Sequence, residues 1–134
     1  MQRADAKDEQ GGTSMEEVSV FSRIIAGELP ARRLYEDELC IVIEDRAPQA
    51  PTHLLIIPRK PLVSVADARQ EDVPLLGHLM WVASQMAERL QLQDGFRLVV
   101  NNGRGAGQTV FHLHIHLLAQ RKLPEAGLAE DLQD

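Results

Sequence analysis

An alternation of histidine and aliphatic residues over residues 112–118, His-Leu-His-Ile-His-Leu-Leu, constrains the fold of this chain most. Successive side chains of a β-strand point to opposite faces, so the segment predicts a strand with three imidazoles on one face. Leu113, Ile115 and Leu117 then lie on the other face and need a core to cover them. Histidine is uncommon, and Thr, Lys or Glu fill an exposed strand face as well. The three imidazoles therefore indicate a site rather than a solvated surface.

The patterns in the rest of the chain predict an α+β domain. The expected strands are 33–36, 39–43, 53–58, 96–101 and 110–119, and the expected helices are 18–27 and 71–91. Because the strands come in runs with one long helix inserted, we expect an antiparallel sheet of about five strands, one short N-terminal helix and one long central helix. Steps of three and four residues in the long helix predict its core-facing stripe: Leu76, Leu79, Met80, Ala83, Ala87 and Leu90.

Length and composition predict one folded domain with polar ends. The 134 residues suit a single domain, which we place at residues 18–121. Residues 1–17 read as a flexible N-terminal tail, in which Met15 is a candidate alternative start, and residues 122–134 as an acidic C-terminal tail. The polar first residues resemble neither a secretory signal nor a transit peptide.

Charge and cysteine content exclude several classes of protein. The net charge of −6 argues against a protein that holds long nucleic acid on a broad basic face. No apolar run approaches the roughly 20 residues that cross a bilayer, so no membrane partner is expected. The single cysteine, Cys40, excludes an internal disulfide and a cysteine-built zinc site, which favours a reducing, cytoplasmic location.

Two kinds of chemistry fit the histidine segment. Histidines at i, i+2 and i+4 can bind zinc or copper, with His53 as a fourth ligand, although one strand supplies three of these ligands and no cysteine closes the shell. Alternatively, a neutral imidazole attacks phosphorus while its neighbours donate protons. Glycines at 103, 105 and 107 favour this second interpretation, because a glycine loop lets backbone amides approach an anion closely.

The segment 107–118 closely resembles the signature of the histidine triad (HIT) superfamily. The resemblance runs from about residue 18 to residue 121 and includes the stretches 20–30 and 44–53. It is strongest to the nucleotide-binding branch, whose members hydrolyse purine nucleoside phosphoramidates. The resemblance therefore implies a HIT-like fold and a site for a purine nucleotide.

The resemblance also implies a role for each residue of the triad. His114 matches the nucleophile that attacks the α-phosphorus and forms a nucleotidyl-histidine intermediate. His112 and His116 match the flanking imidazoles that orient the nucleophile and assist departure of the amine. His53 matches an upstream histidine that hydrogen-bonds into the triad. Asp45 matches the carboxylate that accepts the ribose hydroxyls.

Further positions match the two ends of the nucleotide pocket. The residues that match the apolar slot around the base are Phe21, Ile24, Leu29 and Ile43. The residues that match the phosphate side are Asn101, Gly107, Gln108 and Thr109. Family members are usually homodimers whose sheets join across a twofold axis, with the long helix in the interface.

The sequence departs from the family pattern in two places, which affect the expected metal binding and the pocket for the leaving group. Some bacterial relatives carry zinc-binding cysteines beside the first helix, but Ser19 and Ser22 stand here, and serine is a poor zinc ligand. We therefore expect neither a metal nor an organic cofactor. Close relatives also have a Trp-Pro-Pro-like C-terminus that shapes the leaving-group pocket, which the sequence from residue 121 onward replaces.

The expected function is hydrolysis of the P–N bond in purine nucleoside phosphoramidates, such as conjugates of AMP with an amine or an amino acid. Two alternatives remain open. The first is a dinucleoside polyphosphate or adenylyl sulfate hydrolase of the same fold. The second is a nucleotide-binding scaffold with little turnover.

Overall fold

A five-stranded antiparallel sheet in the order β1-β2-β3-β5-β4 forms the centre of the computed structural model, which describes residues 19–120. The strands are β1 (Arg33–Glu36), β2 (Cys40–Glu44), β3 (Thr52–Pro58), β4 (Phe96–Val99) and β5 (Ile115–Ala119). The helices are α2 (Val20–Ile25) and α3 (Val73–Arg89), and short 3-10 turns occupy Val65–Asp67, Gln70–Asp72 and Arg104–Ala106. The expected α+β fold is confirmed, while both predicted tails lie outside the described residues.

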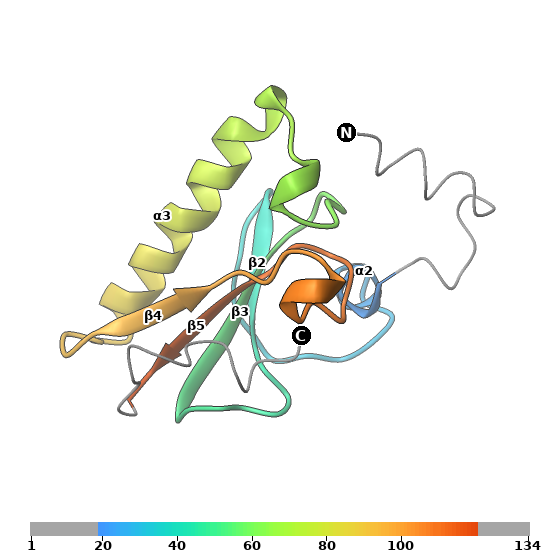
Figure 1. Ribbon diagram of the computed structural model, residues 1–134. Helices are drawn as coiled ribbons and strands as arrows, with labels where there is room; N and C mark the ends of the chain where they lie inside the picture. The colour runs from blue at the N-terminus through green and yellow to red at the C-terminus, as the bar shows by residue number, and fades with distance from the viewer. Residues whose placement is uncertain (1–18, 121–134) are drawn as a thin grey trace.

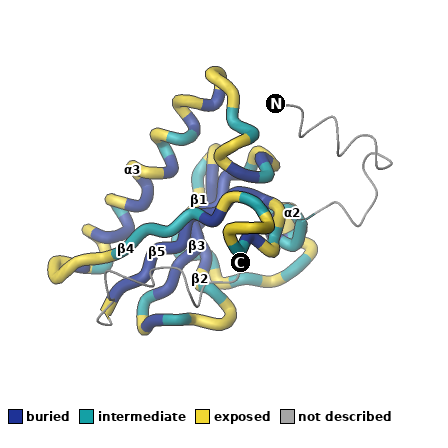
Figure 2. Tube along the Cα trace, in the orientation of Figure 1, coloured by how far each residue is buried: buried dark blue, intermediate teal, exposed yellow. Residues whose placement is uncertain are grey.

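The two helices lie on opposite sides of the sheet (Figure 1). Long helix α3 packs on one side, where the sheet contributes Val42, Leu54, Ile56, Ile115 and Leu117, and the segment before β5 adds Leu113. Short helix α2 covers part of the other side, where Phe21 and Ile24 pack against Ile41, Ile43, Leu55 and Ile57. Strands β2, β3 and β5 are consequently buried along nearly their whole length (Figure 2).

Strand β5 is shorter than the expected 110–119 and begins only at Ile115. The pairing of β3 with β5 ends at Ile56 and Ile115, so Pro58 falls opposite Leu113 and offers no N–H to continue the ladder. The amide of Leu113 donates instead to the carbonyl oxygen of Leu62 over 2.7 Å. His112 and His114 therefore precede the strand, although Leu113 still points into the α3 core as the alternation predicted.

One residue of α3 that was predicted to lie in the core, Met80, lies on the outer surface of the helix. Met80 was expected to face the core, but 53% of it is exposed, and Val82 and Met86 are buried instead. Val73 and Trp81 are similarly exposed, at 59% and 54%. The described part of α3 thus carries apolar residues on both of its faces.

Asp72 is the N-cap residue of helix α3, and its carboxylate accepts a hydrogen bond from the amide of Arg69 and pairs with Lys60. Pro74 lies in the first turn, where a missing amide hydrogen costs nothing. Over residues 19–120 neither α3 nor any other helix has the length and hydropathy to cross a bilayer.

Candidate active site

Four buried histidines lie together on the α2 side of the sheet. His53 comes from β3, His116 from β5, and His112 and His114 from the segment before β5; none is more than 4% exposed. The ring centroids of His53 and His116 are 5.2 Å apart, and those of His114 and His116 are 5.1 Å apart. The structure thus brings together the four histidines that the sequence singled out.

Backbone carbonyls fix the tautomers of His112 and His114. Nε2 of His112 lies 2.8 Å from the carbonyl oxygen of Pro58, and Nδ1 of His114 lies 2.7 Å from the carbonyl oxygen of His112. A carbonyl oxygen only accepts, so each of these ring nitrogens carries a hydrogen. The lone pair of neutral His114 therefore lies on Nε2, as a nucleophile requires.

A second chain of hydrogen bonds fixes His53 and His116. The amide of Gln49 donates to Nδ1 of His53 over 2.9 Å, so the ring hydrogen of neutral His53 lies on Nε2. That Nε2–H donates to Nδ1 of His116, also over 2.9 Å. The hydrogen of neutral His116 must then lie on Nε2, which is buried and has no hydrogen-bond partner within residues 19–120.

Burial lowers the pKa of three of these rings, His53, His112 and His116. It lowers the pKa of His116 to about 3, with the charges of His114 and His53 adding to the effect and Asp45 opposing it. Burial also lowers the pKa of His112, against the stabilising carbonyl of Pro58, and the pKa of His53, against the Asp45 carboxylate. Around neutral pH the flanking imidazoles are therefore uncharged before a ligand binds.

Asp45 follows the end of β2 and has a side chain that is only 6% exposed. Its Oδ1 accepts a hydrogen bond from the amide of Ala47, which shapes the proline-containing loop. Its Oδ2 lies 3.5 Å from Nε2 of His53. Asp45 therefore connects the loop to the histidine cluster, and it also lines the cleft described next.

An apolar cleft of about 470 Å³ opens beside Asp45. Its lining includes three of the four residues expected around a base: Phe21, Ile24 and Ile43. The fourth, Leu29, packs against the same apolar cluster without lining the cleft. The ring of Phe21 meets the ring of His114 edge-on at a centroid distance of 4.9 Å, so the cleft and the triad share a wall.

The loop that precedes the triad supplies the expected phosphate-side residues. Asn101 is buried, with 7% of its surface exposed. Its Nδ2 has no hydrogen-bond partner among the described residues. Gly107 adopts a left-handed conformation with φ 94°, which favours glycine. Thr109 is exposed.

The side chain of Gln108, which was matched to the phosphate side, is bound within the protein. Its Nε2 donates to the carbonyl oxygens of Val63 and Val110, and its Oε1 accepts from the amide of Gly103. All of these bonds stay within the protein, and the residue is 1% exposed. The Gln108 side chain therefore braces the loop, and Asn101 is the better-placed donor for a ligand.

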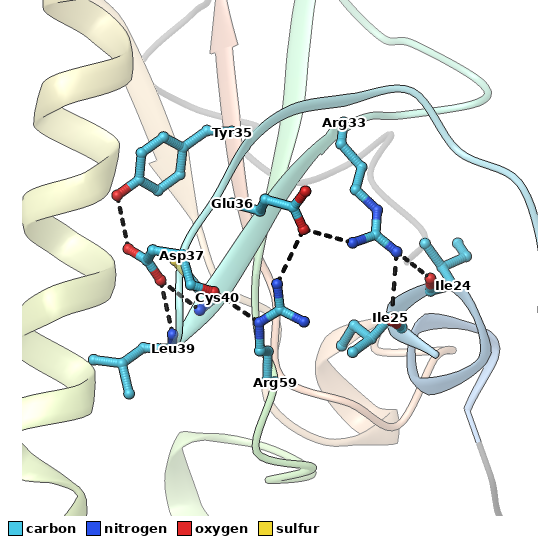
Figure 3. A network of polar contacts seen from close by, with 9 residues as sticks. All are labelled: Ile24, Ile25, Arg33, Tyr35, Glu36, Asp37, Leu39, Cys40 and Arg59. Atoms are coloured by element: carbon cyan, nitrogen blue, oxygen red, sulfur yellow. Dashed lines mark hydrogen bonds and ion pairs between the residues drawn. The ribbon is translucent and has the colours of Figure 1, made fainter. Parts of the chain in front are cut away.

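Helix α2, which carries Phe21 and Ile24, is held by a charged network (Figure 3). The guanidinium of Arg33 donates to the carbonyl oxygens of Ile24 and Ile25 at the end of the helix, over 2.6 and 3.4 Å. Glu36 bridges Arg33 and Arg59, at 2.8 and 3.1 Å. Exposed ion pairs stabilise little, but charged donors at a helix C-terminus are favourable.

Sequence reasoning missed the partners of His112 on this helix. The Oγ atoms of Ser19 and Ser22 lie 2.9 and 3.2 Å from Nδ1 of His112. Two serines three residues apart at the start of a helix are a visible signal, because Ser is a preferred N-cap residue. Their sequence separation from His112 conceals the contact.

Two groups of side chains within residues 19–120 have donors close enough for a metal ion. Asp45, His53 and His116 form one, and Asp37, Cys40 and His78 form the other. In the second group the Asp37 carboxylate already accepts hydrogen bonds from Tyr35 and His78, each over 2.7 Å. Burial raises the pKa of Cys40 to about 12, so its sulfur stays a thiol, which is a poor ligand.

Comparison with known families agrees with this geometry. The HIT domain profile matches residues 26–123. The chain belongs to the HIT-domain family. A HIT-like protein of Synechocystis is 52% identical over 107 residues, which cover 80% of this chain and 94% of the relative. A second HIT-like protein, from Synechococcus elongatus, is 47% identical and covers 81% and 96%.

Solved HIT structures share the fold. A HIT family hydrolase from Legionella pneumophila superposes with a TM-score of 0.79 at 39% identity, covering 81% of this chain and 97% of that one. A HIT family hydrolase from Clostridium thermocellum gives 0.78 at 42% identity, covering 81% and 96%. A zinc-bound histidine triad protein from Mycobacterium smegmatis gives 0.67 at 34% identity, covering 82% and 78%. Two of these three neighbours are HIT family hydrolases, which indicates hydrolysis as the general class of chemistry.

Proposed function

We propose that this HIT-domain protein hydrolyses the P–N bond of purine nucleoside phosphoramidates through a nucleotidyl-histidine intermediate. The observation that carries the proposal is the hydrogen bond from Nδ1 of His114 to the carbonyl oxygen of His112. In the neutral form of this buried imidazole, that hydrogen bond leaves the lone pair on Nε2. Such a nitrogen attacks phosphorus without first losing a proton.

In the first step the Nε2 lone pair of His114 forms a bond to the α-phosphorus. The P–N bond to the leaving group breaks, and its electron pair goes to the amine nitrogen. That nitrogen takes a proton from solvent water. Neutral His116 keeps its Nε2–H and donates a hydrogen bond from it to a phosphate oxygen.

In the second step water attacks the phosphorus of the intermediate. The water proton passes to solvent, the P–N bond to His114 breaks, and its electron pair returns to Nε2 of His114. The products are AMP and the free amine, and His114 regains its starting protonation.

Buried polar atoms without partners support a phosphate at this place. Nε2 of His116 and Nδ2 of Asn101 are buried donors with no hydrogen-bond partner within the described chain. A buried donor left unpaired costs about 1–3 kcal/mol. Phosphate oxygens accept from several donors at once, and each of these groups is a donor that such an oxygen would satisfy.

The cleft supports a nucleoside beside that phosphate. Its volume of about 470 Å³ suits a small ligand, and its apolar wall of Phe21, Ile24 and Ile43 suits a base. Asp45 lies between this wall and His53, where its carboxylate can accept two ribose hydroxyls. We assign the base to the apolar end and the phosphate to the histidine end.

We further propose that the reaction needs no metal. The Mycobacterium smegmatis neighbour is zinc-bound, but in this chain the hydroxyls of Ser19 and Ser22 contact His112, and serine is a poor zinc ligand. Treatment with a chelator should leave turnover unchanged. Stoichiometric zinc in the purified protein, with activity lost on its removal, would contradict this.

We also propose that the protein is a homodimer with the outer side of α3 in the interface. Val73, Met80 and Trp81 are each more than half exposed, and they recur on one outer side of the helix. Exposed apolar residues grouped on one element are typical of an interaction surface. A second copy of the chain would cover them.

A competition assay tests the proposed activity. A phosphoramidate of AMP and lysine is mixed with diadenosine polyphosphate, and release of AMP from each is measured. We expect the phosphoramidate to be the preferred substrate by kcat/KM. Faster cleavage of the polyphosphate would reassign the leaving group, and cleavage of neither would leave a nucleotide-binding protein.

A further inference from the structure

The N-terminus of α2 contacts the triad through two hydroxyl groups. Oγ of Ser19 lies 2.9 Å and Oγ of Ser22 lies 3.2 Å from Nδ1 of His112. The same Ser19 is the N-cap of the helix, because its Oγ accepts a hydrogen bond from the amide of Ser22 over 2.9 Å. One side chain therefore starts the helix and binds a triad histidine.

The direction of each hydrogen bond follows from the groups involved. The carbonyl oxygen of Pro58 accepts from Nε2 of His112, so neutral His112 has its lone pair on Nδ1. That lone pair requires a donor, and the nearest hydrogens are those of the two hydroxyls. Ser19 already accepts from the backbone, which leaves its own hydrogen to donate to His112.

The fixed position of His112 in turn fixes the ring of His114. With its ring held at both nitrogens, residue 112 presents its carbonyl oxygen to Nδ1 of His114 at 2.7 Å. The ring of Phe21, from the same helix as the serines, lies against the rings of His112 and His114 at centroid distances of 6.2 and 4.9 Å. The helix therefore supports the proposed nucleophile by polar and by aromatic contacts.

We propose that Ser19 and Ser22 are positioning residues for His114, which they aim by holding His112 neutral and fixed. The two hydroxyls donate, so they favour the uncharged form of His112, whereas a carboxylate at the same place would favour the imidazolium. The inference about kinetics rests on the proposed hydrolase activity. The inference about protonation does not.

Four variants separate this role from simple support of the helix. Ser22→Ala removes one hydroxyl and keeps the N-cap. Ser19→Asp keeps a good N-cap acceptor but replaces the donor with a carboxylate. The double variant Ser19→Ala/Ser22→Ala removes both donors, and Ser19→Thr is the conservative control that keeps cap and donor.

The first readout is the nitrogen NMR spectrum of the histidine side chains, with His112 assigned by its loss in His112→Gln. We expect the Nε2–H tautomer in the wild-type protein and in Ser19→Thr. Ser19→Asp should give a doubly protonated His112 at neutral pH. A wild-type Nδ1–H tautomer, or a neutral His112 in Ser19→Asp, would overturn the proposal.

The second readout is turnover of the AMP–lysine phosphoramidate. In the double variant we expect kcat to fall about tenfold, as expected for one lost hydrogen bond to a buried group, with AMP affinity changed less than about twofold. Ser19→Thr should retain the wild-type kcat. Unchanged kcat, or equal losses in kcat and AMP affinity, would overturn the proposal. If the wild-type protein cleaves no phosphoramidate, the proposed function fails, while the spectra still decide the protonation of His112.

Discussion

Nε2 of His53 donates to Nδ1 of His116 across 2.9 Å, and this contact links two strands far apart in the sequence. Leu55 pairs directly with His116 in the sheet, so His53 is a diagonal neighbour two residues earlier in β3. The side chains span that diagonal because both lie on the α2 side. The pair holds a buried donor at Nε2 of His116, where a phosphate oxygen can accept its hydrogen.

Buried neutral histidines make stability depend on pH. The pKa of His116 falls from its ordinary 6.5 to about 3, and the pKa values of His53 and His112 also fall. Below pH 6.5 the unfolded chain takes up protons that the folded chain does not. The free energy of unfolding should therefore decrease as pH falls from about 6.5 toward 3, and stay level above 6.5.

Urea denaturation at a series of pH values measures this effect. His116→Gln keeps an acceptor for His53 but cannot titrate, so its free energy of unfolding should fall less steeply. The slope should differ from wild type by up to about 1.4 kcal/mol per pH unit. Parallel curves for the two proteins would show that His116 is not held neutral in the fold.

Asp45→Asn should weaken AMP binding about tenfold or more, because a charge-assisted hydrogen bond contributes about 1.5–3 kcal/mol. The asparagine oxygen still accepts from the amide of Ala47, so the loop should keep its shape. Calorimetric titration with AMP and with its 2′,3′-dideoxy analogue gives the test. The analogue should bind wild type and variant equally; an equal loss for both ligands would remove Asp45 from the ribose site.

Trp81→Glu should convert the proposed homodimer into a monomer, since it places a charge on the outer side of α3, where Trp81 is 54% exposed. Sedimentation velocity measures the change. Gln93→Glu adds the same charge at an exposed position beyond α3 and should remain dimeric. A monomeric wild-type protein, or a dimeric Trp81→Glu, would contradict an interface on this helix.

The sequence predicted the fold largely because alternation and helical periodicity report burial directly. Leu113, Ile115 and Leu117 enter the α3 core as their spacing required. Periodicity failed at Met80, because an apolar residue on an outer helix surface looks the same as a core residue. The start of β5 was also missed, since it depends on Pro58 of a neighbouring strand rather than on the residues of β5.

The types of residue in the sequence predicted which residues form the candidate site, but they did not predict what those residues contact. The structure brings His53, His112, His114 and His116 together, as local chemistry suggested. The inward bonds of Gln108 were not foreseen, because its partner Val63 is 45 residues away. The contacts of Ser19 and Ser22 with His112 likewise depend on tertiary packing, which sequence spacing does not encode.

The central claim is that His114 is the nucleophile. We would incubate wild-type protein and His114→Asn with an AMP–lysine phosphoramidate, stop the reaction rapidly and analyse peptides by mass spectrometry. The account predicts an AMP adduct on His114 in the wild-type protein, and neither adduct nor turnover in the variant, with AMP binding retained. An adduct on another histidine, or turnover that survives His114→Asn, would contradict it.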